Sequence, residues 1–127
     1  MDFSNYLANK LISGTVRNTS YPAPRNVYLA LYKTDPTKDN VGIEVTGASY
    51  TRPEVTFAVP ADGVSQNLAQ ISYAVATTNW GEVGWVGVMD SETDGNLLYF
   101  TELENHKNIL TGDELKFKLN EITLTLT

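Results

Sequence analysis

The stretch that decides the fold runs from residue 79 to residue 100 and reads NWGEVGWVGVMDSETDGNLLYF. Two apolar, β-rich runs flank the polar segment DSETDGN, which is the pattern of a hairpin whose strands build a core. Gly81, Gly84 and Gly87 recur at every third position, a spacing that suits neither a regular strand nor a helix. Glycine inside a strand indicates a bulge or the close approach of a backbone or a large ring. We predict that Trp85 lies in the core and that Trp80 is partly exposed.

Further strands are predicted on both sides of this hairpin. Alternating apolar side chains, or β-branched and aromatic residues between turn signals, predict strands at residues 26–33, 50–59, 67–75, 114–119 and 122–127. Pro53 places its own position at a sheet edge or a bulge. Residues 102–108 have no clear period and are interpreted as a looser segment. Residues 15–25 and 34–47 form long polar loops.

One helix is predicted, at residues 3–13. Its apolar stripe has helical spacing and consists of Phe3, Leu7 and Leu11, flanked by Tyr6 and Ile12. Asp2 or Ser4 is a suitable cap, and Gly14 stands where helices typically end. A helix this short is marginal alone, so it must dock on another surface. One helix followed by about seven short strands predicts an all-β fold, a single antiparallel β-sandwich or jelly-roll-like domain over residues 1–127.

Composition excludes several classes of function. The chain of 127 residues has no cysteine, which excludes disulfides, thiolate catalysis and cysteine-based metal sites. Its formal net charge of −6 argues against nucleic-acid binding, which needs a basic face. No segment has the length of a membrane span, and the N-terminal residues lack the pattern of a signal peptide. We therefore expect no nucleic acid and no membrane among its partners.

The motifs that carry a family resemblance are spread over nearly the whole chain. They are FSNYLANKL at residues 3–11, VYLALY at 27–32, TDP at 34–36, YTRP at 50–53, WGEV at 80–83, VGVMD at 86–90, GNLLY at 95–99 and GDEL at 112–115. In this order and spacing they resemble a family of small tailed-phage virion proteins, the tail-fibre-like and head-decoration proteins. The resemblance implies a structural subunit without catalysis or cofactors.

The residues themselves offer few catalytic or metal-binding patterns. Residues 90–96 resemble the opening of a calcium loop, but Thr101 stands where a bidentate glutamate is required, so a solvated hairpin turn is favoured and no metal is assigned. His106 is the only histidine and is expected in solvent, which leaves no two-histidine site. No Gly-x-Ser-x-Gly motif is present, and most acids lie in turns. We expect no enzymatic activity.

Two surfaces are candidates for binding. Phe3, Tyr6, Leu7 and Leu11 either pack across the end of their own sandwich or engage a neighbouring subunit, and we take them as the candidate partner interface. Trp80, if exposed, is a candidate platform for a host glycan.

The expected role is that of an exterior capsid decoration or cement protein that stabilises the phage head. The alternatives are a tail-tip or tail-fibre-base component and a host-glycan-binding module. The expected partners are the major capsid protein or other virion subunits, with self-association. The expected location is the virion, after synthesis in the host cytoplasm.

Overall fold

The structure, a computed structural model, describes residues 1–126. One helix and nine strands make up the regular structure of these residues. They are β1 (Asp2–Phe3), α1 (Asn5–Val16), β2 (Val27–Tyr32), β3 (Glu54–Val55), β4 (Val64–Gln66), β5 (Ile71–Ser72), β6 (Gly81–Met89), β7 (Leu97–Ile109), β8 (Lys116–Phe117) and β9 (Thr123–Thr125).

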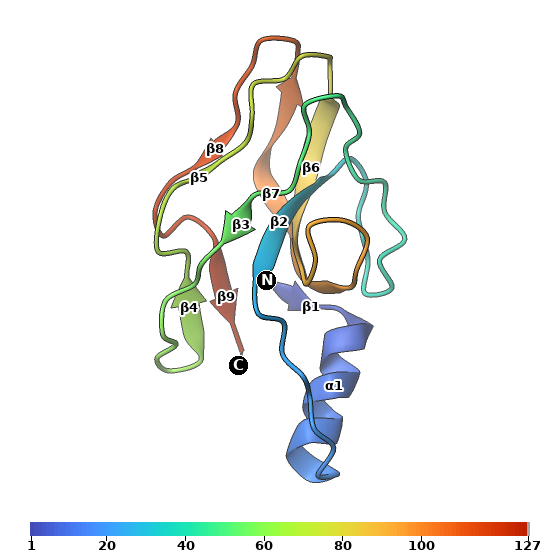
Figure 1. The fold of residues 1–127 in the computed structure, drawn as a ribbon, viewed down its shortest axis with the longest axis vertical. Coiled ribbons are helices and arrows are strands. Elements are labelled where there is room, and N and C mark those ends of the chain that lie inside the picture. Colours follow the sequence, from blue (N-terminus) through green and yellow to red (C-terminus); the bar gives the residue numbers. More distant parts are fainter. Residues whose placement is uncertain (127) are drawn as a thin grey trace.

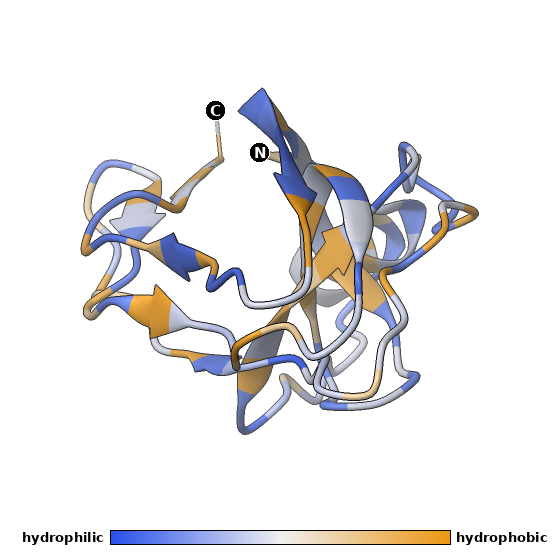
Figure 2. Cartoon of the chain, turned by 90° about the horizontal axis from the view of Figure 1, so that it is seen from above, coloured by the Kyte–Doolittle hydropathy of each residue, from blue (hydrophilic) through white to orange (hydrophobic). Residues whose placement is uncertain are grey.

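The largest unit is a five-stranded antiparallel sheet in the order β1-β7-β6-β2-β3 (Figure 1). Two short antiparallel pairs, β4–β9 and β5–β8, complete the β structure. Figure 2 shows these pairs across the interior of the molecule from the main sheet. The predicted all-β, sandwich-like fold with a short N-terminal helix is therefore confirmed, and the hairpin over residues 79–100 forms its centre as β6 and β7.

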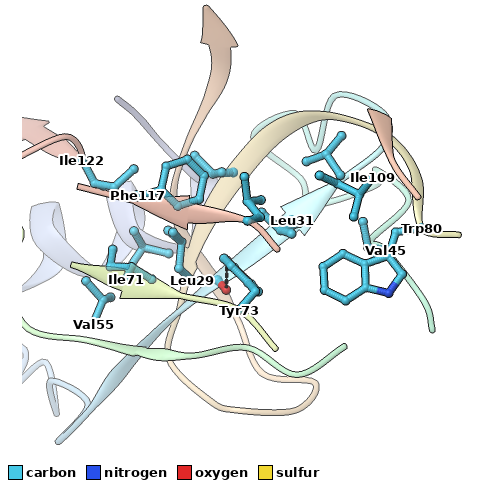
Figure 3. Close-up of a cluster of buried hydrophobic side chains, with 14 of the residues drawn as sticks. Leu29, Leu31, Val45, Val55, Ile71, Tyr73, Trp80, Ile109, Phe117 and Ile122 are labelled. Atoms are coloured by element: carbon cyan, nitrogen blue, oxygen red, sulfur yellow. Dashed lines mark hydrogen bonds between the residues drawn. The ribbon is translucent and has the colours of Figure 1, made fainter. Parts of the chain in front are cut away.

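The main sheet is buried on both faces where β2 pairs with β6. Leu29 and Leu31 face the large core cluster, which Figure 3 shows together with residues from β5, β8 and the loops. Ala30 and Tyr32 alternate with them and belong to a second, smaller cluster. Full burial of a leucine side chain contributes about 2 kcal/mol to the free energy of folding. Both faces of β2 therefore stabilise the sheet.

Polar atoms inside the large cluster are mostly matched. The buried Tyr73 hydroxyl donates to the carbonyl of Leu29 at 2.7 Å (Figure 3). Asn67, which is fully buried, donates to the carbonyls of Ala69 and Lys118 and accepts from the Ile122 backbone. The Asn67 side chain bonds to backbone groups of the neighbouring loops. The predicted strand at 67–75 is therefore not continuous from Asn67 onwards. Only Ile71–Ser72 of that segment pairs as β5, while β4 ends just before Asn67.

The expected roles of the two tryptophans are reversed. Trp80 is 1% exposed and lies in the large cluster, edge-on to Tyr50 and Tyr73. Trp85 is partly buried and packs on the smaller cluster. The cause is a register shift between Val83 and Trp85, which moves the next inward position of β6 to Val86. A regular strand would have kept Val83 and Trp85 on one face.

The register shift is the bulge that the glycine spacing predicted. Val83 pairs with Lys107 and Trp85 with Glu102, so residues 103–106 of β7 lie opposite the single residue Gly84. A Cβ atom added at Gly84 would lie 2.7 Å from the ring of His106. Gly84 therefore lies at a bulge and also makes room for a large ring, the two features that a glycine inside a strand indicates.

Several predicted boundaries are wrong. The segment 102–108 belongs to β7 instead of being loose, because β6 continues beside it beyond the bulge. In the predicted strand at 50–59 only Glu54–Val55 pairs with β2. The strands at 114–119 and 122–127 shorten to β8 and β9, and Thr127 lies outside the described residues.

The helix begins and ends two to three residues later than predicted. Phe3 pairs with Tyr99 in β1, and Ser4 is the N-cap, accepting from the Leu7 backbone at 3.1 Å. The helix continues through Gly14 to Val16. In Figure 1 its C-terminal half extends beyond the sheet, with the connector to β2 running back alongside it.

Candidate functional site

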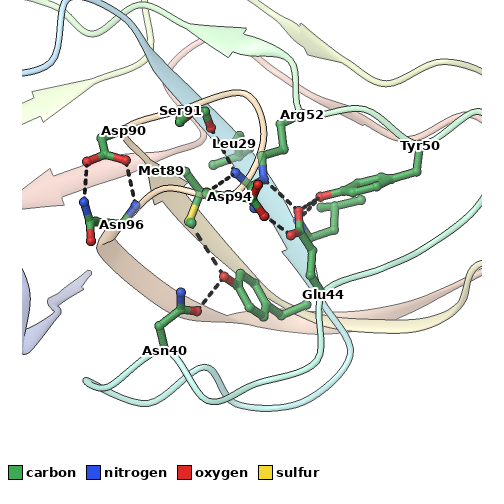
Figure 4. Close-up of polar contacts among 12 residues, drawn as sticks. Leu29, Asn40, Glu44, Tyr50, Arg52, Met89, Asp90, Ser91, Asp94 and Asn96 are labelled. Carbon is green, nitrogen blue, oxygen red and sulfur yellow. Dashed lines mark hydrogen bonds and ion pairs between the residues drawn. The ribbon is translucent and has the colours of Figure 1, made fainter.

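The buried guanidinium of Arg52 connects two loops that are far apart in the sequence (Figure 4). Its Nε and Nη2 donate to Oε2 and Oε1 of Glu44, at 2.8 and 2.7 Å, in a bidentate ion pair. Its Nη1 donates to the carbonyls of Ser91 and Asp94 at 2.9 and 2.8 Å. Arg52 therefore holds the long loop that contains Glu44 against the hairpin turn between β6 and β7.

The local backbone aims Arg52 at these partners. The residue before a proline is restricted to extended conformations, and Pro53 follows directly. The carbonyl of Pro53 accepts from the Leu29 amide at 3.0 Å, which fixes this segment beside β2. The guanidinium is matched by one carboxylate and two carbonyls, so it is not free to bind an anion.

Two tyrosines extend this polar network towards the sheet. The Tyr50 hydroxyl donates to Glu44 at 2.5 Å and accepts from the Leu31 amide at 3.0 Å. Burial, and next the Glu44 carboxylate, raise the pKa of Tyr50 well above its usual range. The Tyr32 hydroxyl donates to Asn40 at 2.7 Å, and burial raises the pKa of Tyr32 to about 12. Both hydroxyls therefore stay protonated at neutral pH. We call Arg52, Glu44, Tyr50, Tyr32 and Asn40 the Arg52 network.

In the hairpin turn, the Asp90 carboxylate binds groups of the turn itself. The Asp90 carboxylate accepts from the Asn96 amide at 2.7 Å and from its side chain at 3.0 Å (Figure 4). Gly95 has φ +76°, and a Cβ there would lie 2.5 Å from Asp90. Residues 1–126 contain no group of three or more acidic or histidine side chains arranged to hold a metal ion.

His106 lies on the outer face of β6 and β7 between two glutamates. Its Nδ1 is 3.0 Å from Glu82 and its Nε2 is 2.9 Å from Glu102, and its ring centroid is 5.2 Å from that of Trp85. Hydrogen bonds to Glu82, and next to Glu102, raise the pKa of His106. Only the imidazolium donates from both nitrogens, so the two carboxylates favour the charged ring. The prediction that His106 is exposed is confirmed. Its ring is nevertheless held in place by Glu82 and Glu102.

The predicted partner residues, Phe3 in β1 and three residues of α1, lie against the protein's own core. Leu7 is 3% exposed, and Phe3, Tyr6 and Leu11 are partly buried against the large cluster. The apolar side chains that α1 leaves in solvent are Ile12 and Val16, 59% and 75% exposed. The helix stripe thus has its docking surface within the chain, and its contact with a neighbouring subunit stays a prediction.

Trp80 does not form the candidate sugar platform. Trp80 is buried, so its ring is not available to stack on a glycan. The partly exposed Trp85 is contacted by His106. In the part of the chain that the structure describes, no helix is long and apolar enough to cross a membrane.

Sequence reasoning missed the Arg52 network and the placement of His106 between Glu82 and Glu102, which we call the His106 clamp. A signal for the first is present, since Arg52 is a charged residue inside the apolar run predicted as a strand. The i, i+4 spacing of Glu102 and His106 is a signal for one half of the clamp. Neither signal identifies the partners Glu44 and Glu82, because the fold brings these together from distant segments.

The chain matches one protein-family model. Residues 2–125 match the family model described as "Podophage GP4 fiber I protein gp80". The match spans nearly the whole chain, from β1 to β9. No curated protein matches the sequence.

Proposed function

The chain belongs to the podophage GP4 fiber I protein gp80 family, and from this membership we propose that it is a non-enzymatic structural subunit of a podophage tail fibre. The observation that carries the proposal is the family match over residues 2–125. Because the match leaves out almost nothing of the chain, the family description applies to the whole fold. Membership of a phage fibre family gives the chain a structural role in the virion.

The geometry supports a mechanical role in two ways. The Arg52 network ties the loop around Glu44, the strand β2 and the hairpin turn into one cross-linked end of the molecule. Its two tyrosines are protonated and its guanidinium is matched within the chain, so the network supplies no base and no anion site. Such a cluster stabilises shape instead of performing chemistry.

The expected role as an exterior capsid decoration or cement protein is the competing proposal. It requires the same absence of chemistry and predicts hundreds of copies on the head. The family description names a fibre and so favours the tail. In the fibre proposal the partners are other structural subunits of the particle, including further copies of this chain, and the subunit joins the virion after synthesis in the host cytoplasm.

Quantitative mass spectrometry of fractionated particles tests the proposal. Intact virions and tailless heads are separated on a density gradient, and the copy number of this chain is measured in each. A fibre subunit is present in intact virions at low copy number and absent from tailless heads. Hundreds of copies on tailless heads would support the decoration role instead, and absence from both fractions would overturn any virion role.

A further inference from the structure

One long edge of the main sheet has no partner strand. β7 pairs with β6 along one edge. On its other edge it meets only β1, at Tyr99 and Phe100. Within residues 1–126 no other strand pairs with this edge, so β7 from Thr101 to Ile109 has an open side. An open strand edge presents amide and carbonyl groups that another strand can pair with.

A groove lies along this open side. β7 forms one wall with Thr101, Glu102, Leu103 and Glu104, and the opposite wall comes from β8, β9 and the turn between them. In Figure 2 the two chain ends lie on the same side of the molecule. Within residues 1–126, β9 pairs only with β4, so a second strand that lines the groove also has an open edge.

Part of the groove lining is apolar, and the size of the groove suits side chains of a strand. Its apolar lining includes Leu103, Met1 and the buried side chains of Phe117 and Ile122. Its volume of about 270 Å³ is below the range of about 300–1,000 Å³ for sites that enclose small molecules. An extended segment would place alternate side chains against this apolar lining while its backbone pairs with β7.

The charge of the groove selects the occupant. Three carboxylates line it, those of Glu102, Glu104 and Glu121, and no lysine or arginine does. A second copy of this chain that paired its β7 with this edge about Leu103 would set Glu102 opposite Glu104 of its partner. Like charges facing one another across a strand pair are destabilising, whereas opposite charges are favourable. Residues 102–104 therefore disfavour this pairing of the chain's own β7 and favour a basic strand.

We propose that, in the particle, an extended segment of another virion subunit adds to the open edge of β7 and fills this groove. Lysine or arginine side chains of that segment face Glu104 and its neighbours, and its apolar side chains contact Leu103. This inference rests on the proposed function, since it names the partner chemistry of the structural subunit. The binding mode is strand addition to a sheet edge, in which backbone bonds supply affinity and side chains supply specificity.

Single-thiol labelling tests whether the edge is covered. The chain has no cysteine, so Glu104→Cys introduces a unique thiol. Glu92→Cys in the hairpin turn is the matched control, since both glutamates are exposed. Maleimide labelling of E104C should slow by at least about tenfold between the free protein and the virion, as expected for a side chain in a desolvated interface. Labelling of E92C should change little. E104C that is no better protected than E92C would overturn the inference.

Cross-linking from the same thiol tests the nature of the occupant. A photoactivatable maleimide on E104C is activated in virions, and the linked peptides are identified by mass spectrometry. A lysine- or arginine-containing segment of another virion protein supports the inference. A link to residues of a second copy of this chain, or no link above the level of E92C, would overturn it.

Charge reversal gives the third arm. Glu104→Lys should reduce the copies of this chain per virion by at least about tenfold, the change that a loss of about 1.4 kcal/mol in binding gives, while Glu92→Lys should not. Equal melting temperatures of the two free variants exclude misfolding. If the wild-type chain is absent from virions, the proposed function fails. If it is present and E104K assembles like E92K, only the inference fails.

Discussion

The Arg52 network and the open edge of β7 differ in where their polar groups find partners. Arg52 is 8% exposed and makes four hydrogen bonds within its own chain, two of them in the ion pair with Glu44. β7 from Thr101 to Ile109 has no strand on its outer side within the described residues, and the groove beside it is lined by three carboxylates, of which only Glu102 contacts a basic group, His106. One region is complete within the chain, and the other is not.

This difference separates what maintains the fold from what is left for assembly. Buried polar groups that are matched internally stabilise one arrangement of the loops and leave nothing for a ligand. Water can bind the amide and carbonyl groups of an open strand edge, but another strand can also pair with them. Monomeric proteins therefore usually cover or shorten such edges. We propose that in the fibre a neighbouring chain completes this edge.

The largest expected effect comes from removing Arg52. Arg52→Ala leaves Glu44 without its counter-ion and two loop carbonyls without a donor. Breaking a largely buried ion pair in this way lowers the free energy of unfolding by about 3 kcal/mol. Urea denaturation followed by circular dichroism measures the change.

The control for this prediction is Arg25→Ala, which removes the same charge from an exposed position. Its effect should stay within about 0.5 kcal/mol, as is usual for surface substitutions. If both variants lose the same stability, the Arg52 network is not what holds this end of the molecule together.

A smaller effect is expected where the core adjoins this network. A Cβ atom added at Gly47 would lie 2.8 Å from the indole of Trp80, a buried and rigid ring. Overpacking of this kind costs about 2 kcal/mol, so Gly47→Ala should lower the melting temperature.

The matched control is Gly14→Ala in α1, where the nearest atom lies 3.5 Å away. Alanine is a better helix former than glycine, so this variant should gain roughly 0.5–1 kcal/mol. A loss of stability in Gly47→Ala and a gain in Gly14→Ala would distinguish the packed core from the exposed helix. The same sign for both would contradict the burial of Trp80 behind Gly47.

The smallest effect on stability is expected at the His106 clamp, on the face of β6 and β7 that carries Trp85. Glu82 and Glu102 raise the pKa of His106 above its ordinary value of 6.5. A raised pKa in the folded state gives stability that is fully present below the unfolded pKa and is lost as the pH rises through the folded pKa. The stability difference between the wild type and His106→Gln should therefore be largest in mild acid and vanish in alkaline solution.

Since His106 is the only histidine, its imidazole signals in an NMR titration report the folded pKa without ambiguity. A midpoint at or below 6.5, or a stability difference that does not change with pH, would show that the two glutamates do not hold the imidazolium.

The sequence predicted the parts of the fold that depend on local pattern. The apolar runs around residues 90–96 identify the hairpin, and the alternation in residues 26–33 identifies a strand buried on both faces. Gly84 predicted a bulge because glycine spacing is itself a local signal. The predicted helix start is wrong because the position of Phe3 fits the helical stripe, although Phe3 pairs with Tyr99 in β1.

Features that depend on distant segments were not predictable in this way. The positions of Trp80 and Trp85 follow from the phase shift at the bulge, which depends on how β7 pairs, and single-strand alternation places them wrongly. The pairing of Arg52 with Glu44 is set by a loop whose path the sequence does not specify. Residues 102–108 lack a strand period because the bulge interrupts it, so their sequence predicts a looser segment where the structure has the open edge of β7.

A high-resolution reconstruction of the intact virion tests the central claim most directly. The account predicts density for this chain in the tail fibre, with its Arg52 network internal and unchanged. It predicts an extended strand of another subunit along the outer side of β7, with basic side chains near Glu104. A chain located on the capsid surface, or a fibre subunit whose β7 edge faces solvent, would contradict it.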